Sequence, residues 1–84
     1  MPLIASFYGI TIRMFFEESK HNPPHIHASY QNHKASYAIS SGEKLSGTMT
    51  RRGERLIQDF IELNRDTLLR IWDTQSFEKI ETLR

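Results

Sequence analysis

The chain has 84 residues, of which 38% are hydrophobic and 25% charged, a balance typical of one small globular domain rather than a disordered chain. It has no cysteine, which excludes disulfide bonds and thiolate metal sites. Its formal net charge of +1 neither requires nor excludes a nucleic-acid ligand. The first residues have no signal-peptide pattern. No stretch of the sequence approaches the run of about 20 apolar residues that a membrane-spanning helix needs. We therefore expect a cytoplasmic protein with no membrane-spanning segment.

The first part of the chain, residues 1–49, is expected to consist mainly of strands. Apolar residues alternate with others from Ile10 to Phe16, which predicts a strand with one apolar face. Tyr8 and Gly9 just before it are interpreted as a bulge or bend. The prolines at 23 and 24 then interrupt the pattern, because they cannot donate ladder hydrogen bonds. Further strands are predicted over residues 26–31, 35–40 and 44–49.

From Thr50 the spacing of apolar residues changes to that of a helix. Thr50 is a predicted N-cap. Asn64 is predicted to end this first helix, and a second helix follows it with Trp72 on its buried side. The two helices would occupy residues 50–77, and residues 78–84 would form an extended tail.

This order of elements predicts an α+β domain spanning residues 1–84, in which an antiparallel three- to four-stranded sheet is followed by two helices packed on one face. Side chains alternate between the two faces of a strand. If the apolar residues of the first two predicted strands face the helices, the residues that alternate with them along each strand face away. That open face would carry Arg13, His25, His27, Ser29, Lys34 and Ser36.

The segment 21–27, His-Asn-Pro-Pro-His-Ile-His, contains three of the four histidines of the chain. His25 and His27 are two residues apart, which places them on the same side of a strand about 6 to 7 Å apart. They are therefore candidate catalytic residues, one as general base and the other as general acid in phosphodiester cleavage. Arg13 would stabilise the anionic transition state.

The same histidines support two other interpretations. His25 and His27 are candidate ligands for a divalent metal, with His21, His33 or Glu17 as the third ligand. Otherwise no cofactor is expected. In the remaining interpretation the histidines are structural, and they hydrogen-bond across the loop to fix the proline turn.

Arg51, Arg52 and Arg55 lie in the first turns of the first predicted helix. The helix dipole disfavours cations at this end, by about 0.3 to 1 kcal/mol each. Free backbone N–H groups and arginines together suit an anion. With Arg13, these arginines are therefore candidate phosphate- or anion-binding residues. The alternative is a solvated basic face that neighbouring acidic residues partly neutralise.

Four motifs of the chain are Phe7-Tyr8-Gly9-Ile10-x-Ile12-Arg13-Met14-Phe15, His21-Asn22-Pro23-Pro24-His25-Ile26-His27-Ala28-x-Tyr30, Gly42-Glu43-x-Leu45-x-Gly47 and Arg51-Arg52. Together they resemble the motifs of a bacterial family, the domain-of-unknown-function family numbered 4160. The approach to the histidines, residues 17–20, is slightly longer here than in the family. The resemblance implies a short prokaryotic protein that is paired with a second small protein, as in toxin–antitoxin modules. It implies no catalytic residues.

Three hypotheses about function follow. The first is a toxin–antitoxin-type component that binds a small cognate protein and, if it is the toxin, targets RNA through His25 and His27. The second is a non-enzymatic interaction module whose open sheet face and tail dock a partner. The third is a small protein that binds a divalent metal. A domain of this size is only marginally stable alone, so a homodimer is also compatible with the sequence.

Overall fold

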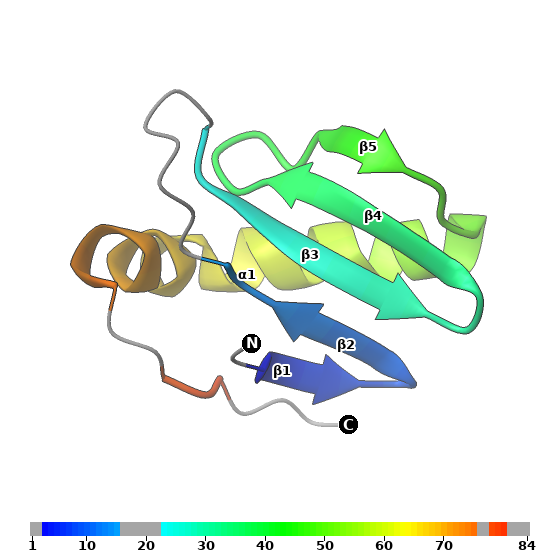
Figure 1. The fold of residues 1–84 in the computed structure, drawn as a ribbon, viewed down its shortest axis with the longest axis horizontal. Helices are drawn as coiled ribbons and strands as arrows, with labels where there is room; N and C mark the ends of the chain where they lie inside the picture. The colour runs from blue at the N-terminus through cyan, green and yellow to red at the C-terminus, as the bar shows by residue number, and fades with distance from the viewer. Residues whose placement is uncertain (1–2, 16–22, 76–77, 81–84) are drawn as a thin grey trace.

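The computed structural model describes residues 3–15, 23–75 and 78–80 of the chain. These residues form an antiparallel sheet whose strands lie side by side in chain order, followed by a helix (Figure 1). The elements are β1 (Leu3–Phe7), β2 (Ile10–Arg13), β3 (His25–Tyr30), β4 (His33–Ala38), β5 (Lys44–Gly47) and α1 (Arg51–Thr74). The α+β class and the antiparallel sheet are confirmed. The predicted numbers of elements were wrong, because the described residues form five strands and one helix.

The strand that the sequence did not reveal is β1, which pairs with β2. Its register shifts between Leu3 and Ala5, and this irregularity breaks the alternation by which strands are recognised. Tyr8 and Gly9 are not a bulge within one strand. They form the tight turn between β1 and β2, with φ of 52° and 82°. Two-residue hairpins favour such positive φ values, because the resulting twist matches that of the strands.

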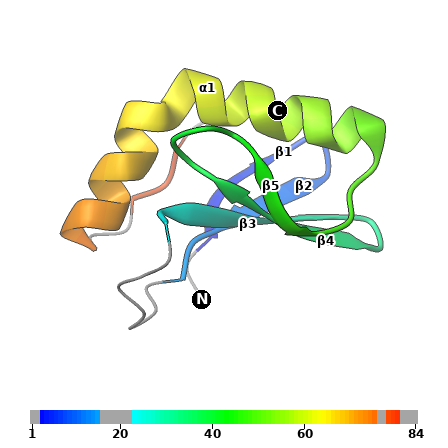
Figure 2. The same ribbon diagram turned by 90° about the horizontal axis from the view of Figure 1, so that it is seen from above.

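Helix α1 begins where the sequence predicted, since Thr50 Oγ1 accepts a hydrogen bond of 2.9 Å from the backbone N–H of Gly53. It does not end at Asn64. Asn64 instead marks a kink, with φ of −119° and ψ of 19°, and its side-chain amide donates to the Phe60 carbonyl oxygen at 3.0 Å. Such bonds to the backbone four residues earlier are associated with bent helices. The second part of α1 therefore turns toward the end of the sheet where β3 begins (Figure 2).

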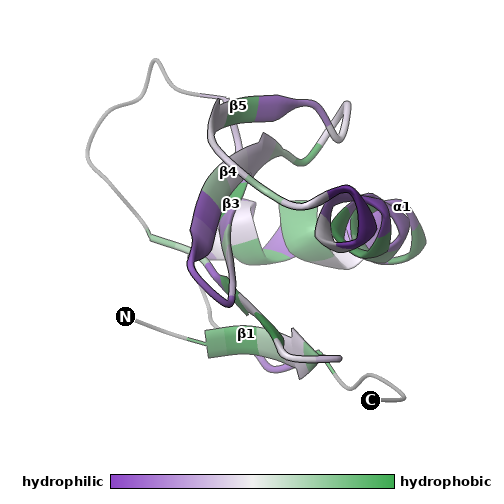
Figure 3. Cartoon of the chain, turned by 90° about the vertical axis from the view of Figure 1, so that its right-hand side faces the viewer, coloured by the Kyte–Doolittle hydropathy of each residue, from purple (hydrophilic) through white to green (hydrophobic). Residues whose placement is uncertain are grey.

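The core lies between one face of the curved sheet and α1, with β1 and β5 at the two sheet edges (Figure 3). The helix and every strand except β5 contribute fully buried side chains to this core. They include Ile4, Ile10, Ile12, Ile26, Tyr37, Ile57, Ile61, Leu68 and Ile71. Burying aliphatic side chains of this kind contributes about 1.5 to 3 kcal/mol each. The apolar residues predicted to face the helices on β2 and β3 do so.

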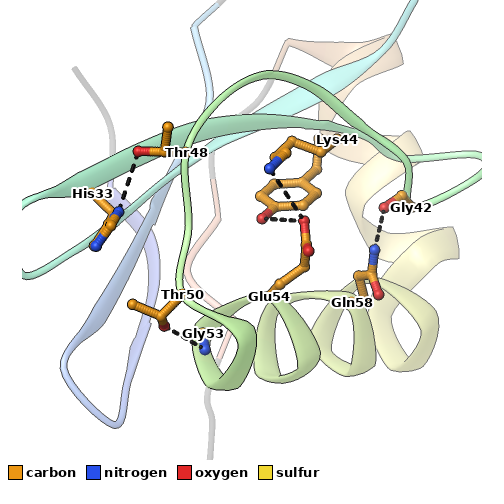
Figure 4. A network of polar contacts seen from close by, with 9 residues as sticks. His33, Gly42, Lys44, Thr48, Thr50, Gly53, Glu54 and Gln58 are labelled. Atoms are coloured by element: carbon orange, nitrogen blue, oxygen red, sulfur yellow. Dashed lines mark hydrogen bonds and ion pairs between the residues drawn. The ribbon is translucent and has the colours of Figure 1, made fainter.

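Polar contacts attach α1 to β4, to the loop before β5 and to the first residue of β5 (Figure 4). The Tyr37 hydroxyl donates to Glu54 Oε2 at 3.1 Å, and Lys44 Nζ lies 3.9 Å from the same oxygen. Gln58 Nε2 donates to the Gly42 carbonyl at 3.1 Å. Burial of the ring, with the nearby Glu54 carboxylate, raises the pKa of Tyr37 well above its usual value.

Residues 78–80 of the predicted tail lie against β1. The Ile80 N–H donates to the Ile4 carbonyl at 2.8 Å, and the Ile80 side chain packs on the core. Arg70 forms an exposed ion pair of 3.0 Å with Glu78. This part of the tail therefore contacts its own sheet, and residues 81–84 are outside the described residues.

Among the described helical residues, no segment is both long enough and apolar enough to cross a lipid bilayer.

Gly47 is expected to be the least replaceable glycine of the sheet. Its φ is +90°, and a Cβ atom there would collide with the Lys34 carbonyl oxygen and lie 2.7 Å from Ala35 Cα. Gly42 is the matched control, because its φ is +78° but a Cβ would meet nothing within 4 Å. Gly42→Ala should cost about 1 to 2 kcal/mol of backbone strain. Gly47→Ala should lower the free energy of unfolding by about 1 to 3 kcal/mol more than Gly42→Ala does, because the added Cβ also collides with the backbone of β4. Equal losses in urea-unfolding free energy would contradict this account of the β4–β5 contact.

Stability should fall at alkaline pH through Tyr37. The unfolded chain releases this proton near its usual pKa of about 10, whereas the folded protein retains it because its pKa is raised. The contribution of Tyr37 to the free energy of unfolding is therefore complete below about pH 10 and is lost as the pH rises further. Unfolding free energies between about pH 9 and about pH 11 should fall less steeply for Tyr37→Phe than for the wild type. The matched control variant is Tyr8→Phe, which removes the hydroxyl of an exposed tyrosine.

Candidate functional site

A row of polar side chains crosses the sheet face opposite α1. The strand register places Arg13 of β2 beside His27 of β3, His27 beside Ser36 of β4, and Ser36 beside Ser46 of β5. Directly paired residues of antiparallel strands point to the same side of the sheet. At about 4.8 Å between strands, the row is about 14 Å long. The open face predicted from alternation therefore exists, and it extends onto β5, where Ser46 had not been predicted.

This row lies in a hollow of about 320 Å³, which we call the main hollow. Its lining residues are Arg13, Phe15, His27, Ala28, Ser29, Lys34, Ala35, Ser36 and Ser46. Two of these are cations and three are serines, and no carboxylate is among the described residues that line it. Arg13 Nη1 donates to Thr11 Oγ1 at 3.2 Å, which orients the guanidinium along the face. The main hollow is thus suited to an anion.

His27 is the histidine that lines the main hollow. Its Nδ1 lies 3.4 Å from Ser36 Oγ, a long contact, and its Nε2 is removed from solvent. The Phe15 ring meets the His27 ring edge-to-face, with centroids 4.5 Å apart. Aromatic pairs prefer this arrangement, so Phe15 helps to fix the imidazole. Phe15 was not predicted as part of the site.

His25 lies beside His27, with ring centroids 5.0 Å apart, as their spacing predicts. The expectation that His25 faces away from the helical residues needs correction, because its ring lies 5.2 Å from Trp72 of α1 and only 6% of the residue is exposed. The cause is the kink, which brings the second part of α1 to the sheet end. That helix had been expected on the far face only, and no local pattern of residues indicates this contact.

The backbone at the two prolines is held by hydrogen bonds to both of its carbonyls. His25 Nδ1 lies 2.8 Å from the Pro23 carbonyl oxygen, which can only accept, so Nδ1 carries the proton and donates. The Pro24 carbonyl accepts from the Ile39 N–H at 3.0 Å. A contact of this kind is what we expect if His25 fixes the proline turn.

Arg51, Arg52 and Arg55 do not join this site. All three are exposed at the start of α1, which packs on the opposite face of the sheet, and with Leu56 they line a separate hollow of about 370 Å³. The structure therefore separates Arg13 from the other predicted anion-binding arginines.

The metal interpretation depends partly on His21 and Glu17, which lie outside the described residues. Within the part of the chain that the structure describes, no three histidine, aspartate or glutamate side chains gather to hold a metal ion. His33, another suggested ligand, has Nδ1 3.2 Å from Thr48 Oγ1 (Figure 4). It is not among the residues that line the main hollow.

Comparison with known proteins identifies the family and nothing closer. No curated protein and no solved structure matches the chain. A family model described as "Domain of unknown function (DUF4160)" matches residues 9–73, which extend from the turn before β2 almost to the end of α1. Because this match covers most of the sequence, the chain belongs to the DUF4160 family.

Proposed function

We propose that the protein binds single-stranded RNA on its open sheet face, as one component of a toxin–antitoxin-type pair. The observation that carries the proposal is the row of Arg13, His27, Ser36 and Ser46 across four strands, with Lys34 in the same hollow. Cations and hydroxyls without an opposing carboxylate are the groups that contact phosphate in nucleic-acid interfaces.

Arg13 and Lys34 would make the phosphate contacts. The bond from Arg13 to Thr11 uses one of the five guanidinium donors and holds the side chain in place. Lys34 is an exposed residue of β4. Strand β4 lies two strands from β2, which carries Arg13, so the two strands are about 10 Å apart. The two cations would thus contact different parts of an extended, negatively charged strand.

RNA is favoured over an acidic protein because aromatic rings accompany the cations. Phe15 and His27 lie against each other in the same hollow. Proteins that bind single strands combine a basic groove with aromatic side chains on which bases stack, often on an open sheet. A net charge of +1 does not oppose this proposal, because the positive charge is local to the hollow.

Binding is better supported than acid–base cleavage by His25 and His27. Nδ1 of His25 donates to the Pro23 carbonyl, and the ring is almost entirely buried against Trp72. Nε2 of His27 is also removed from solvent. A general base must come within about 3 Å of the proton that it removes, which is difficult for a buried nitrogen. Cleavage by these histidines and metal binding remain weaker proposals.

The second candidate is the interaction module, in which the partner is a small cognate protein. All four residues of β5 are exposed, and β5 lies at a sheet edge. Edge strands can pair with a strand from another chain. Co-expression with the product of the adjacent gene would test this candidate, and two proteins that never copurify would count against it.

RNA binding should depend on Arg13 and Lys34. Fluorescence anisotropy with a labelled single-stranded RNA should show weaker binding for Arg13→Gln and for Lys34→Gln. Each variant should also reduce the slope of log affinity against log salt by about 0.7, the value expected for one lost phosphate contact on a single strand.

The matched controls are Lys79→Gln, an exposed lysine outside the main hollow, and Arg52→Gln on α1. Both should bind RNA as the wild type does. A larger effect of Arg52→Gln than of Arg13→Gln would place the ligand on the helix and overturn the proposal.

His25 should act through structure. His25→Phe keeps a ring against Trp72 but loses the Nδ1 bond to Pro23, so the free energy of unfolding should fall by about 1 kcal/mol. His33→Phe, which alters a more exposed histidine, should cost less. RNA cleavage by the wild type that disappears in His25→Phe, with stability unchanged, would show instead that His25 is catalytic.

A further inference from the structure

A second, smaller hollow adjoins the main hollow on the open face. It has a volume of about 190 Å³ and is lined by Pro23, His25, Ser36, Leu45 and Ser46. Ser36 and Ser46 line both hollows and face each other in the β4–β5 register. The two spaces therefore meet at this pair of hydroxyls.

The two hollows differ in chemistry. Arg13 and Lys34 line only the main hollow, whereas the smaller one has no charged group among the described residues that line it. Its walls are the Pro23 ring, the His25 ring and Leu45, which is 45% exposed although it is a large apolar residue. Two rings and an aliphatic side chain as walls suit a flat ring system.

The wall formed by His25 is held in place before any ligand arrives. Nδ1 donates to the Pro23 carbonyl, and the ring packs against those of His27 and Trp72. A wall that is already ordered loses little side-chain entropy on binding, which favours affinity. The burial that argues against a catalytic His25 is thus consistent with a binding role.

We propose that the smaller hollow is a base-binding subsite, so that the groove recognises a ribonucleotide as one unit. The phosphate lies near Arg13 and Lys34, the base lies against His25 and Leu45, and the sugar lies at Ser36 and Ser46. A serine hydroxyl both donates and accepts, as the ribose 2′-hydroxyl does, and this group distinguishes RNA from DNA. This inference rests on the proposed RNA function and names the ligand unit that the groove would accept.

The test is an NMR titration of the full chain with four small ligands: uridine monophosphate, deoxyuridine monophosphate, ribose phosphate and inorganic phosphate. Uridine monophosphate should bind more tightly than ribose phosphate, by a factor of about 5 at least. This factor corresponds to the lower end of the affinity that one stacked base contributes. Leu45→Ser should abolish this difference. Leu63→Ser should not, because Leu63 is 84% exposed on α1 outside both hollows.

The wild type should bind uridine monophosphate more tightly than deoxyuridine monophosphate, which lacks the 2′-hydroxyl. The double variant Ser36→Ala/Ser46→Ala should bind the two with equal affinity. Well-dispersed spectra would verify that each variant is folded. If ribose phosphate binds as tightly as uridine monophosphate while RNA still binds through Arg13, the base subsite is wrong and the proposed function stands. If neither the phosphates nor RNA perturb the open face, both proposals fail.

Discussion

The register of β3 against β2 and β4 determines where Arg13, His27 and Ser36 lie. Because side chains alternate along a strand, the pairing that buries Ile12, Ile26 and Tyr37 also places Arg13 and His27 together on the opposite face. A slip by one residue would bury the cation and expose the core, so the apolar core enforces the polar row. The site is in this sense a consequence of the packing on the other side of the sheet.

The kink at Asn64 gives the two histidines different environments. A straight α1 would continue along the face on which the core lies, whereas the bent helix brings Trp72 to the sheet end and covers His25. His27, two residues further along β3, lines the main hollow. Two residues of one type, two positions apart on one strand, thereby have separate places, one in the wall of the smaller hollow and the other in the main hollow.

Local patterns were sufficient to predict the parts of the structure that depend on neighbouring residues. Alternation predicted the faces of β2 and β3, hence the placement of Arg13 and His27, and the capping preference of threonine predicted the start of α1. Strand β1 was missed because its irregular register hides the alternation. The burial of His25 was missed because Trp72 is 47 positions away in the chain, and only the bend of α1 brings the two rings within 5.2 Å. Non-local contacts of this kind leave no periodic pattern in a single sequence.

The central claim is that the open sheet face, and not the basic start of α1, holds the RNA. Mapping the backbone amide NMR shifts of the full chain during titration with a short single-stranded RNA tests it most directly. We expect the largest changes around Arg13, His27, Ser36 and Ser46, in one band across β2 to β5. Changes concentrated at residues 51–56, with the sheet unaffected, would contradict the account.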